Sequence, residues 1–150
     1  MYTPHTITLI IAEEQEDGSF AYNPSVLSGV FLDLNKRSNV NRSGLADADA
    51  ATLFVPFSVA AAGLDGAAKT YLTPKAYEAL EDAKKPQFWT LFDGGKSGPA
   101  ECYFVKGAIT DEDYSFSHMR DTYDYVYRVT SVDLRDFGRA RMHHWQVGGR

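Results

Sequence analysis

The 150-residue sequence is poor in three features: cysteine, long apolar runs and net positive charge. It has 1 cysteine, Cys102, which excludes an intrachain disulfide and favours a reducing, cytoplasmic setting over secretion. No stretch approaches the roughly 20 apolar residues needed to cross a bilayer, and residues 1–18 lack the basic start of a signal peptide. We therefore expect a soluble, intracellular protein that does not contact membranes.

The scarcity of positive charge bears on nucleic-acid binding. The net charge is −5 and the sequence pI is about 5.3. A nucleic-acid-binding protein needs a basic face that releases counterions from phosphates, so this balance speaks against sequence-specific binding of DNA or RNA. A cluster of Lys36, Arg37 and Arg42 still allows a small local basic patch.

The residues that are abundant favour strands. Hydrophobic residues make up 44% of the chain, which is enough for the core of one domain. Aromatic residues reach 13%, with 9 Tyr and 9 Phe, and such side chains fit pleated sheets better than helices. We expect a single β-rich domain over residues 1–150.

Apolar and β-branched runs bounded by turn signals predict about six to eight strands. Asp17-Gly18 predicts the turn of a long first hairpin with an acidic tip, and Gly29 predicts a bulge in its second strand. The last two strands are expected to pair across a turn at Gly138, and residues 110–123 to hold a turn of helix. The predicted strands are 5–12, 26–34, 52–57, 87–92, 101–109, 124–138 and 141–147.

One clear helix is predicted, over about residues 74–84. Thr73 suits the N-cap, Pro74 the first helical position, and Pro86 would end the helix. The Ala- and Gly-rich segment 58–70 is expected to be a loop. The fold class is therefore mainly β, a small β-barrel or sandwich with long loops and one short helix.

The histidines and the cysteine do not form a recognisable catalytic or metal-binding motif. His143 and His144 are adjacent, so in a strand they point to opposite faces and cannot readily hold one metal ion. We expect a closing strand with a packed Trp145 and a half-exposed histidine. Cys102 lies in a strand-like run with nothing nearby to stabilise a thiolate, so we expect a buried thiol.

Other chemistry-bearing stretches also fail their structural requirements. The loop "GGKSG" (94–98) lacks the glycine that a phosphate-binding loop needs at Thr90, and a strand rather than a helix follows it. The carboxylates of 47–49 and 110–114 lack the ligand spacing of a calcium loop. Ser, His and Asp occur together in 115–124, but closeness in sequence is not triad geometry. We expect no catalytic residue, no metal and no cofactor.

The order of the segments resembles a family of small structural proteins of tailed phages and prophages, the minor capsid or head–tail connector proteins. The opening strand "HTITLIIAEE", the helix "YLTPKAYEALED" leading into "FWTLFDGG", and "YFVKG" followed by "ITDED" carry the resemblance. The closing segments "YDYVYRVTSVDLRDFG" and "HHWQVGGR" are its most specific part, together with Val-Lys-Gly. The resemblance spans nearly the whole chain, except that residues 58–70 have no counterpart.

This resemblance implies a non-enzymatic virion protein at the portal vertex, a head-completion or stopper-like component of the neck. Such a protein is expected to self-associate into a ring and to contact portal or adaptor proteins and tail-side proteins. DNA would pass it without sequence-specific binding, helped by an acidic channel lining that repels phosphates. Its location would be the host cytoplasm during assembly and the virion neck afterwards.

Long loops and the tail are the expected sources of assembly contacts, because a Gly-Gly tail can extend along a neighbour's sheet edge. Two alternatives stay open. One is a tail terminator or other tail-joining protein. The other is a small ligand-binding or hydrolytic β-barrel protein that uses His118, His143, His144 or Cys102. The candidate contact residues are Lys36, Arg37, Arg42, Gly148, Gly149 and Arg150.

Overall fold

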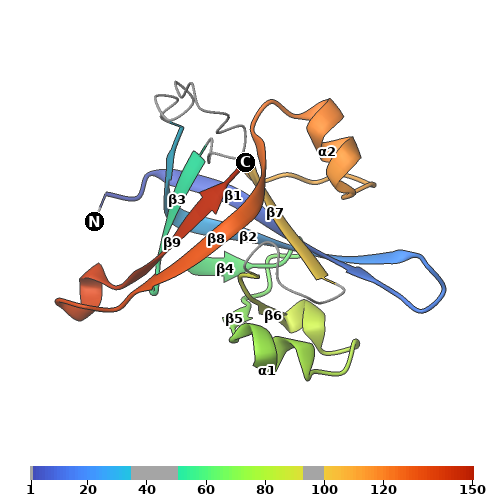
Figure 1. The fold of residues 1–150 in the computed structure, drawn as a ribbon, viewed down its shortest axis with the longest axis horizontal. Coiled ribbons are helices and arrows are strands. Elements are labelled where there is room, and N and C mark those ends of the chain that lie inside the picture. Colours follow the sequence, from blue (N-terminus) through green and yellow to red (C-terminus); the bar gives the residue numbers. More distant parts are fainter. Residues whose placement is uncertain (1, 35–50, 93–99) are drawn as a thin grey trace, which may run out of the picture.

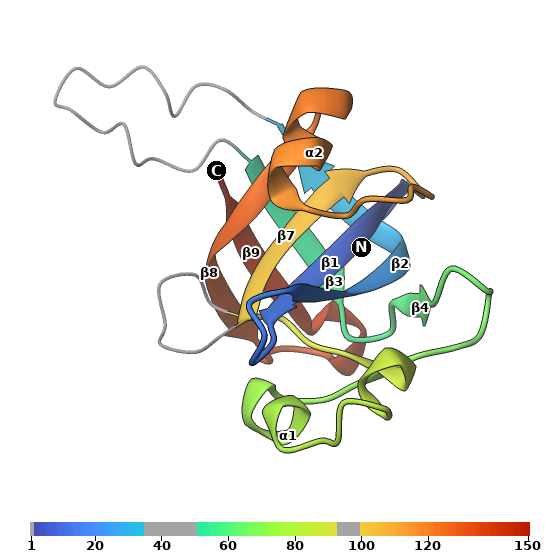
Figure 2. The ribbon, with the colours of Figure 1, turned by 90° about the vertical axis from the view of Figure 1, so that its right-hand side faces the viewer.

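A computed structural model describes residues 2–34, 51–92 and 100–150. In this part of the chain, six strands close into an antiparallel barrel (Figure 1, Figure 2). Around the barrel the order is β1, β2, β3, β9, β8 and β7, and β7 pairs again with β1. The predicted mainly β fold is confirmed. The barrel strands are β1 (His5–Glu14), β2 (Phe20–Asp33), β3 (Ala51–Pro56), β7 (Ala100–Lys106), β8 (Val126–Arg135) and β9 (His144–Gly149).

The first hairpin, β1–β2, has the predicted turn and bulge. Gly18 has a φ of +86°, a value that glycine adopts without strain, and the Gln15 amide donates to the Ser19 carbonyl at 2.7 Å across the turn. Gly29 has a φ of +90° and lies where the β1–β2 register shifts. Both glycines are therefore required by backbone conformation.

The alternation of β1 explains how its two faces build two cores. Ile7, Leu9 and Ile11 point into the barrel, whereas Ile10 and Ala12 point outward and are also buried. The inner core is completed by residues from the other strands and from the segment that covers one end of the barrel. Its other buried members are Leu27, Val30, Leu32, Ala51, Leu53, Val55, Ala61, Tyr77, Trp89, Leu91, Cys102, Phe104, Val129, Trp145 and Val147.

The outer core lies under α2 (Phe116–Thr122), which packs outside the barrel against β1 and β7 (Figure 2). Met119 of this helix is fully buried, and the Tyr103 hydroxyl donates to the Tyr114 carbonyl in the arm that leads to α2. The prediction of a helical turn within 110–123 is confirmed. The buried members are Ile10, Ala12, Tyr103, Val105, Tyr114, Met119 and Val126.

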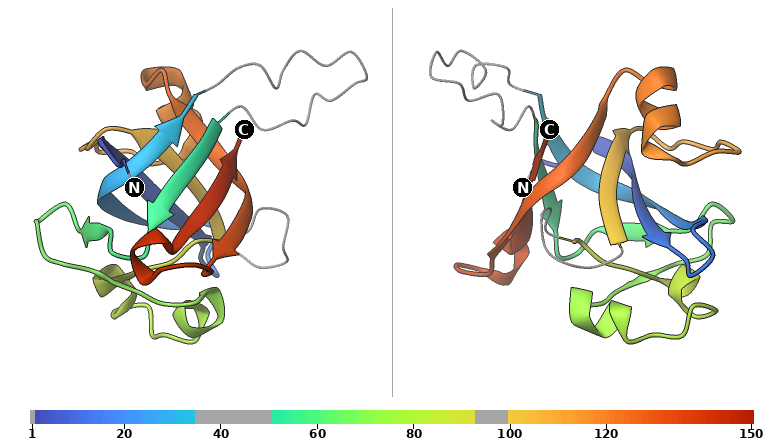
Figure 3. Two further views of the ribbon diagram at one scale, coloured as in Figure 1. Left: turned by 90° about the vertical axis from the view of Figure 1, so that its left-hand side faces the viewer. Right: turned by 45° about the vertical axis from the view of Figure 1, so that its right-hand side comes forward.

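The end of the barrel away from α2 is covered by residues 58–92, called here the end segment (Figure 3). Tyr77, Trp89 and Leu91 of this segment belong to the inner core, so it closes the barrel at that end. The elements at this end are β4 (Ala60–Ala62), β5 (Thr70–Tyr71), α1 (Pro74–Glu78), the 3₁₀ turn Lys85–Gln87 and β6 (Phe88–Trp89).

The end segment departs from the sequence predictions. The predicted helix over 74–84 is too long, because α1 ends at Glu78. Thr73 and Pro74 do begin it as predicted, but Ala76 and Ala83 are exposed, so no continuous apolar stripe supports further turns. The predicted loop 58–70 contains two short strands, because Ala60–Ala62 add to the free edge of β2.

The predicted strand 87–92 is also shorter in the structure, where β6 spans Phe88–Trp89. It pairs in parallel with β5, so the two strands form a separate small sheet rather than a part of the barrel wall.

Candidate functional site

An open apolar groove of ≈ 590 Å³ lies between the end segment and the β8–β9 hairpin. Its walls come from elements far apart in the sequence, which the closure of the barrel brings together. Six of the lining side chains are aliphatic or aromatic, and the others are a threonine and a proline. They are Phe57, Tyr71, Thr73, Pro74, Leu91, Val132, Leu134 and Trp145.

Trp145 organises the aromatic side chains around the groove. In β9, Trp145 and Val147 point inward, and Trp145 is 8% exposed. Its ring centroid lies 4.4 Å from that of Phe57, 4.4 Å from that of Tyr71 and 5.7 Å from that of Trp89. Burial raises the pKa of Tyr71, so its phenol stays neutral at physiological pH. The groove is therefore lined by rigid, uncharged rings.

The β8–β9 hairpin tip, residues 134–143, projects from the barrel beside the groove (Figure 3). Leu134 is 58% exposed, Phe137 70% and Met142 45%. Gly138, with a φ of +82°, makes the turn that was predicted there. Three large exposed apolar side chains on one hairpin tip make it a candidate interaction surface. We call the groove and this tip together the apolar end.

His144, the first residue of β9, and His143, which precedes it, contribute packing and backbone contacts. His144 lies 5.7 Å from Phe54 between ring centroids, and His143 lies 5.7 Å from Phe57. His144 Nδ1 is 2.9 Å from the Met142 carbonyl oxygen. The predicted packing of Trp145 in a closing strand is confirmed, but the strand spans His144–Gly149 instead of 141–147, because a 3₁₀ turn occupies Ala140–Met142. Within residues 2–34, 51–92 and 100–150, no three His, Cys, Asp or Glu side chains gather as a metal-binding group.

Cys102 lies in β7 and points into the inner core, as predicted for a buried thiol. Burial raises the pKa of the Cys102 thiol to about 12. The thiolate is the nucleophilic form, so at neutral pH this side chain packs as a small apolar group.

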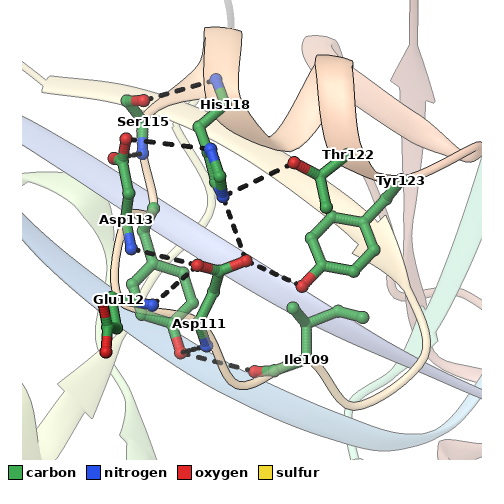
Figure 4. Close-up of polar contacts among 9 residues, drawn as sticks. Ile109, Asp111, Glu112, Asp113, Ser115, His118, Thr122 and Tyr123 are labelled. Atoms are coloured by element: carbon green, nitrogen blue, oxygen red, sulfur yellow. Dashed lines mark hydrogen bonds and ion pairs between the residues drawn. The ribbon is translucent and has the colours of Figure 1, made fainter.

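A polar cluster beside α2 joins Asp111, His118 and Tyr123 (Figure 4). Asp111 Oδ2 accepts from the Tyr123 hydroxyl at 2.9 Å and lies 3.1 Å from His118 Nε2. Its Oδ1 accepts from the backbone amides of Glu112 and Asp113, at 2.7 and 3.2 Å. The Asp113 amide, and after it the Tyr123 hydroxyl, lower the pKa of Asp111 to about 2, so the carboxylate stays charged.

The serine and threonine of this cluster do not complete a catalytic triad. Ser115 caps α2, since its Oγ accepts from the His118 amide at 3.4 Å. Thr122 Oγ1 lies 3.5 Å from His118 Nε2, the same nitrogen that faces Asp111. His118 Nδ1 faces Asp113 Oδ2 at 4.0 Å, which is beyond hydrogen-bond distance, so this carboxylate does not orient the ring for the Thr122 hydroxyl as a triad requires. The cluster therefore anchors α2 to the arm before it.

The Gly-Gly tail is a wall of the barrel, and its expected extension along a neighbour's sheet is wrong. Gly148 and Gly149 are buried in β9, which pairs with β3 on one side and β8 on the other, so both backbone edges are occupied. Arg150 is exposed, and its backbone exchanges two 3.0 Å hydrogen bonds with Arg128. Lys36, Arg37 and Arg42 lie outside the described residues, as does the "GGKSG" loop.

A buried polar network, which sequence reasoning missed, anchors the end segment to β2. Asn23 Nδ2 donates to the Tyr77 hydroxyl at 2.8 Å and to the Lys85 and Phe88 carbonyls at 3.0 and 3.1 Å. Lys69 Nζ donates to Asn23 Oδ1 at 2.6 Å, and burial lowers the pKa of Lys69 to about 8. The partners are distant in sequence, so no local pattern indicates this network.

The apolar end was also missed, although the sequence carries a signal for it. Leu134, Phe137 and Met142 are large apolar residues at and beside a predicted turn, where polar residues are usual. Large apolar side chains at such a position are unusual and were the available signal for this surface.

The described residues thus define a closed antiparallel β-barrel protein with an apolar groove at one end. Over residues 2–150 the chain matches the family described as "Family of unknown function (DUF6751)", and it belongs to this family. No curated protein and no solved structure matches the chain significantly. None of the helices in the described ranges is long and apolar enough to span a bilayer.

Proposed function

We propose that this protein is a non-enzymatic structural component of a phage or prophage virion, acting at the portal vertex as a head–tail connector of the stopper-like kind. The order of its segments, which resembles that of such proteins, supports the proposal. The observation that carries it is the apolar end, where Leu134, Phe137 and Met142 are exposed beside an aromatic groove. A surface of this kind serves docking to another protein chain.

In this proposal the protein forms a ring that joins portal or adaptor proteins to tail-side proteins. It assembles in the host cytoplasm and ends in the virion neck. DNA passes the ring without sequence-specific contacts, consistent with a net charge of −5. The closed barrel supplies a rigid body for each subunit, because its strands satisfy one another's backbone hydrogen bonds.

Deletion of the gene in the phage or prophage that encodes this chain tests the connector role. DNA-filled heads and finished tails should accumulate unjoined in electron micrographs, and infectious titre should be lost. Normal joining without the protein would overturn the proposal.

Complementation of the deletion tests the apolar end. A Leu134→Asp/Phe137→Asp variant should fold, because both side chains are exposed, but should fail to restore titre. The matched control is Leu64→Asp, an exposed leucine of the end segment (46%) that lies outside the apolar end. Full titre with the folded double variant would show that docking does not use this surface.

A second candidate function is small-ligand binding in the groove. Its volume of ≈ 590 Å³ falls in the range of roughly 300–1,000 Å³ that is typical of ligand pockets. Ligand binding here would use the aromatic rings of the groove, because Cys102 is buried and does not line it. Saturable quenching of Trp145 fluorescence by a small aromatic ligand, with a matching rise in melting temperature, would favour it over the connector role.

A further inference from the structure

The β1–β2 turn presents exposed negative charge. Between residues 14 and 20 it carries Glu14, Glu16 and Asp17, all exposed, and no basic residue. Phe20 follows at 45% exposure and stacks on Tyr22, with ring centroids 6.3 Å apart. We call this turn the acidic tip.

The acidic tip is held in one conformation by its own hydrogen bonds. Asp17 Oδ1 accepts from the Ser19 amide at 3.0 Å and from the Ser19 hydroxyl at 2.6 Å. These bonds lower the pKa of Asp17, so its charge is kept at physiological pH. A preorganised turn loses little conformational entropy when a partner binds it.

The β8–β9 hairpin tip in the apolar end has the opposite charge. Residues 134–143 contain three arginines and one aspartate, Asp136. Arg139 and Arg141 are both exposed and lie on either side of Ala140, in the turn that also exposes Phe137 and Met142. An apolar surface with a positively charged rim suits an apolar partner that carries negative charge.

The two tips lie at opposite ends of the longest axis of the molecule (Figure 1). The right-hand view of Figure 3 also shows them on opposite sides of the molecule. One chain thus carries two complementary surfaces that cannot meet within the same molecule. Surfaces of this kind join copies head to tail, which gives a closed ring when the rotation between copies closes.

We infer that the partner of the apolar end is the acidic tip of a second copy of this chain. Phe20 of one copy packs against the apolar end of the next, while Glu16 and Asp17 face Arg139 and Arg141. Phe20 is 45% exposed, so its docking removes from water at most about half of the roughly 150–250 Å² that an aromatic side chain can bury. The charges at the rim set the register and speed the encounter. This inference specifies the contact of the proposed ring and rests on that proposed function.

Cysteine cross-linking in the purified full chain tests the inference directly. A Glu16→Cys variant and an Arg141→Cys variant, mixed and oxidised, should form disulfide-linked dimers at least tenfold faster than either variant alone. Native Cys102 is buried and stays out of the reaction. An Asp121→Cys variant, altered at an exposed acid on α2, replaces Glu16→Cys in the control mixture and should not cross-link.

Charge reversal gives a second, independent readout. Glu16→Lys/Asp17→Lys and Arg139→Glu/Arg141→Glu should each weaken self-association more than tenfold in sedimentation experiments, because like charges then meet. Mixing the two variants restores opposite charges at every contact and should restore association. High salt should weaken wild-type association as well.

Three results would overturn the inference. One is that Glu16→Cys cross-links with itself as fast as it does with Arg141→Cys, which indicates a two-fold contact. A second is no cross-linking in the mixture. The third is association that survives reversal of the acidic tip but is lost on reversal of the arginines, which indicates a different partner. The gene-deletion experiment tests head–tail joining independently of this contact. If the cross-linking experiments fail but deletion still blocks joining, this inference is wrong and the connector role is retained.

Discussion

Substitution of Gly149 by alanine is the most direct test of how the chain's last residues are used. Built on the backbone, a Cβ at this position would lie 2.9 Å from Phe104 Cζ and 2.9 Å from Tyr127 Cβ. Both contacts are far inside van der Waals distance. Gly149 is held between β3 and β8, so the new methyl group cannot move away without distorting the barrel wall.

Overpacking of this kind costs about 1–3 kcal/mol of the free energy of unfolding. For a chain of this length, each kcal/mol lowers the melting temperature by roughly 2–4 °C. Gly149→Ala should therefore melt several degrees below the wild type. Phe104→Leu should relieve part of the clash, so the double variant should be more stable than the sum of the single changes predicts.

Urea denaturation followed by circular dichroism measures these free energies. The control is Lys75→Ala, at an exposed position of α1, which should change stability by less than about 0.5 kcal/mol. A Gly149→Ala protein as stable as the wild type would refute the reasoning, because that is the behaviour of a free tail.

Three further outcomes follow from the same structure. Trp145→Ala should cost about 3–5 kcal/mol in urea denaturation, because it empties the centre of the groove wall, and a cost below about 1 kcal/mol would contradict this. The charged Asp111 stabilises the fold above pH 3.8, and this contribution is lost as the pH falls towards 2. The melting temperature of Asp111→Asn should therefore fall less steeply than that of the wild type over this pH range. Parallel curves for the two proteins would contradict the role of Asp111 in anchoring α2. Cys102 should react with a thiol reagent only after unfolding, because raising its pKa from 9.0 to about 12 leaves roughly 1,000-fold less thiolate, and rapid labelling of the folded protein would contradict its burial.

Period-2 alternation and turn residues were sufficient to predict most of the barrel. β2 alternates between buried and more exposed positions, and β1, buried on both faces, shows as a short apolar run. Gly18, Gly29 and Gly138 stand where the backbone has a positive φ. The end segment was predicted poorly for a physical reason. Its conformation depends on distant partners such as Asn23, which binds three groups 54 to 65 residues away, and local propensity does not report such contacts.

The candidate site shows the same division. The packed role of Trp145 and the buried thiol of Cys102 follow from strand geometry, and both were predicted. The groove was not, because Phe57, Tyr71 and Leu134 meet only when the barrel closes. The Gly-Gly segment was predicted to be a docking arm, because glycine is common in flexible tails. Glycine also occurs in packed strands where a Cβ has no room, which is the case for Gly149.

The position of β9 also affects the order in which the chain can fold. This strand fills the gap between β3 and β8, so the barrel stays open until residue 149 has emerged from the ribosome. Until then the edges of β3 and β8 are unpaired, and Phe104 is exposed to solvent and to other nascent chains. A product that lacks β9 would leave those edges unpaired and would be prone to aggregation.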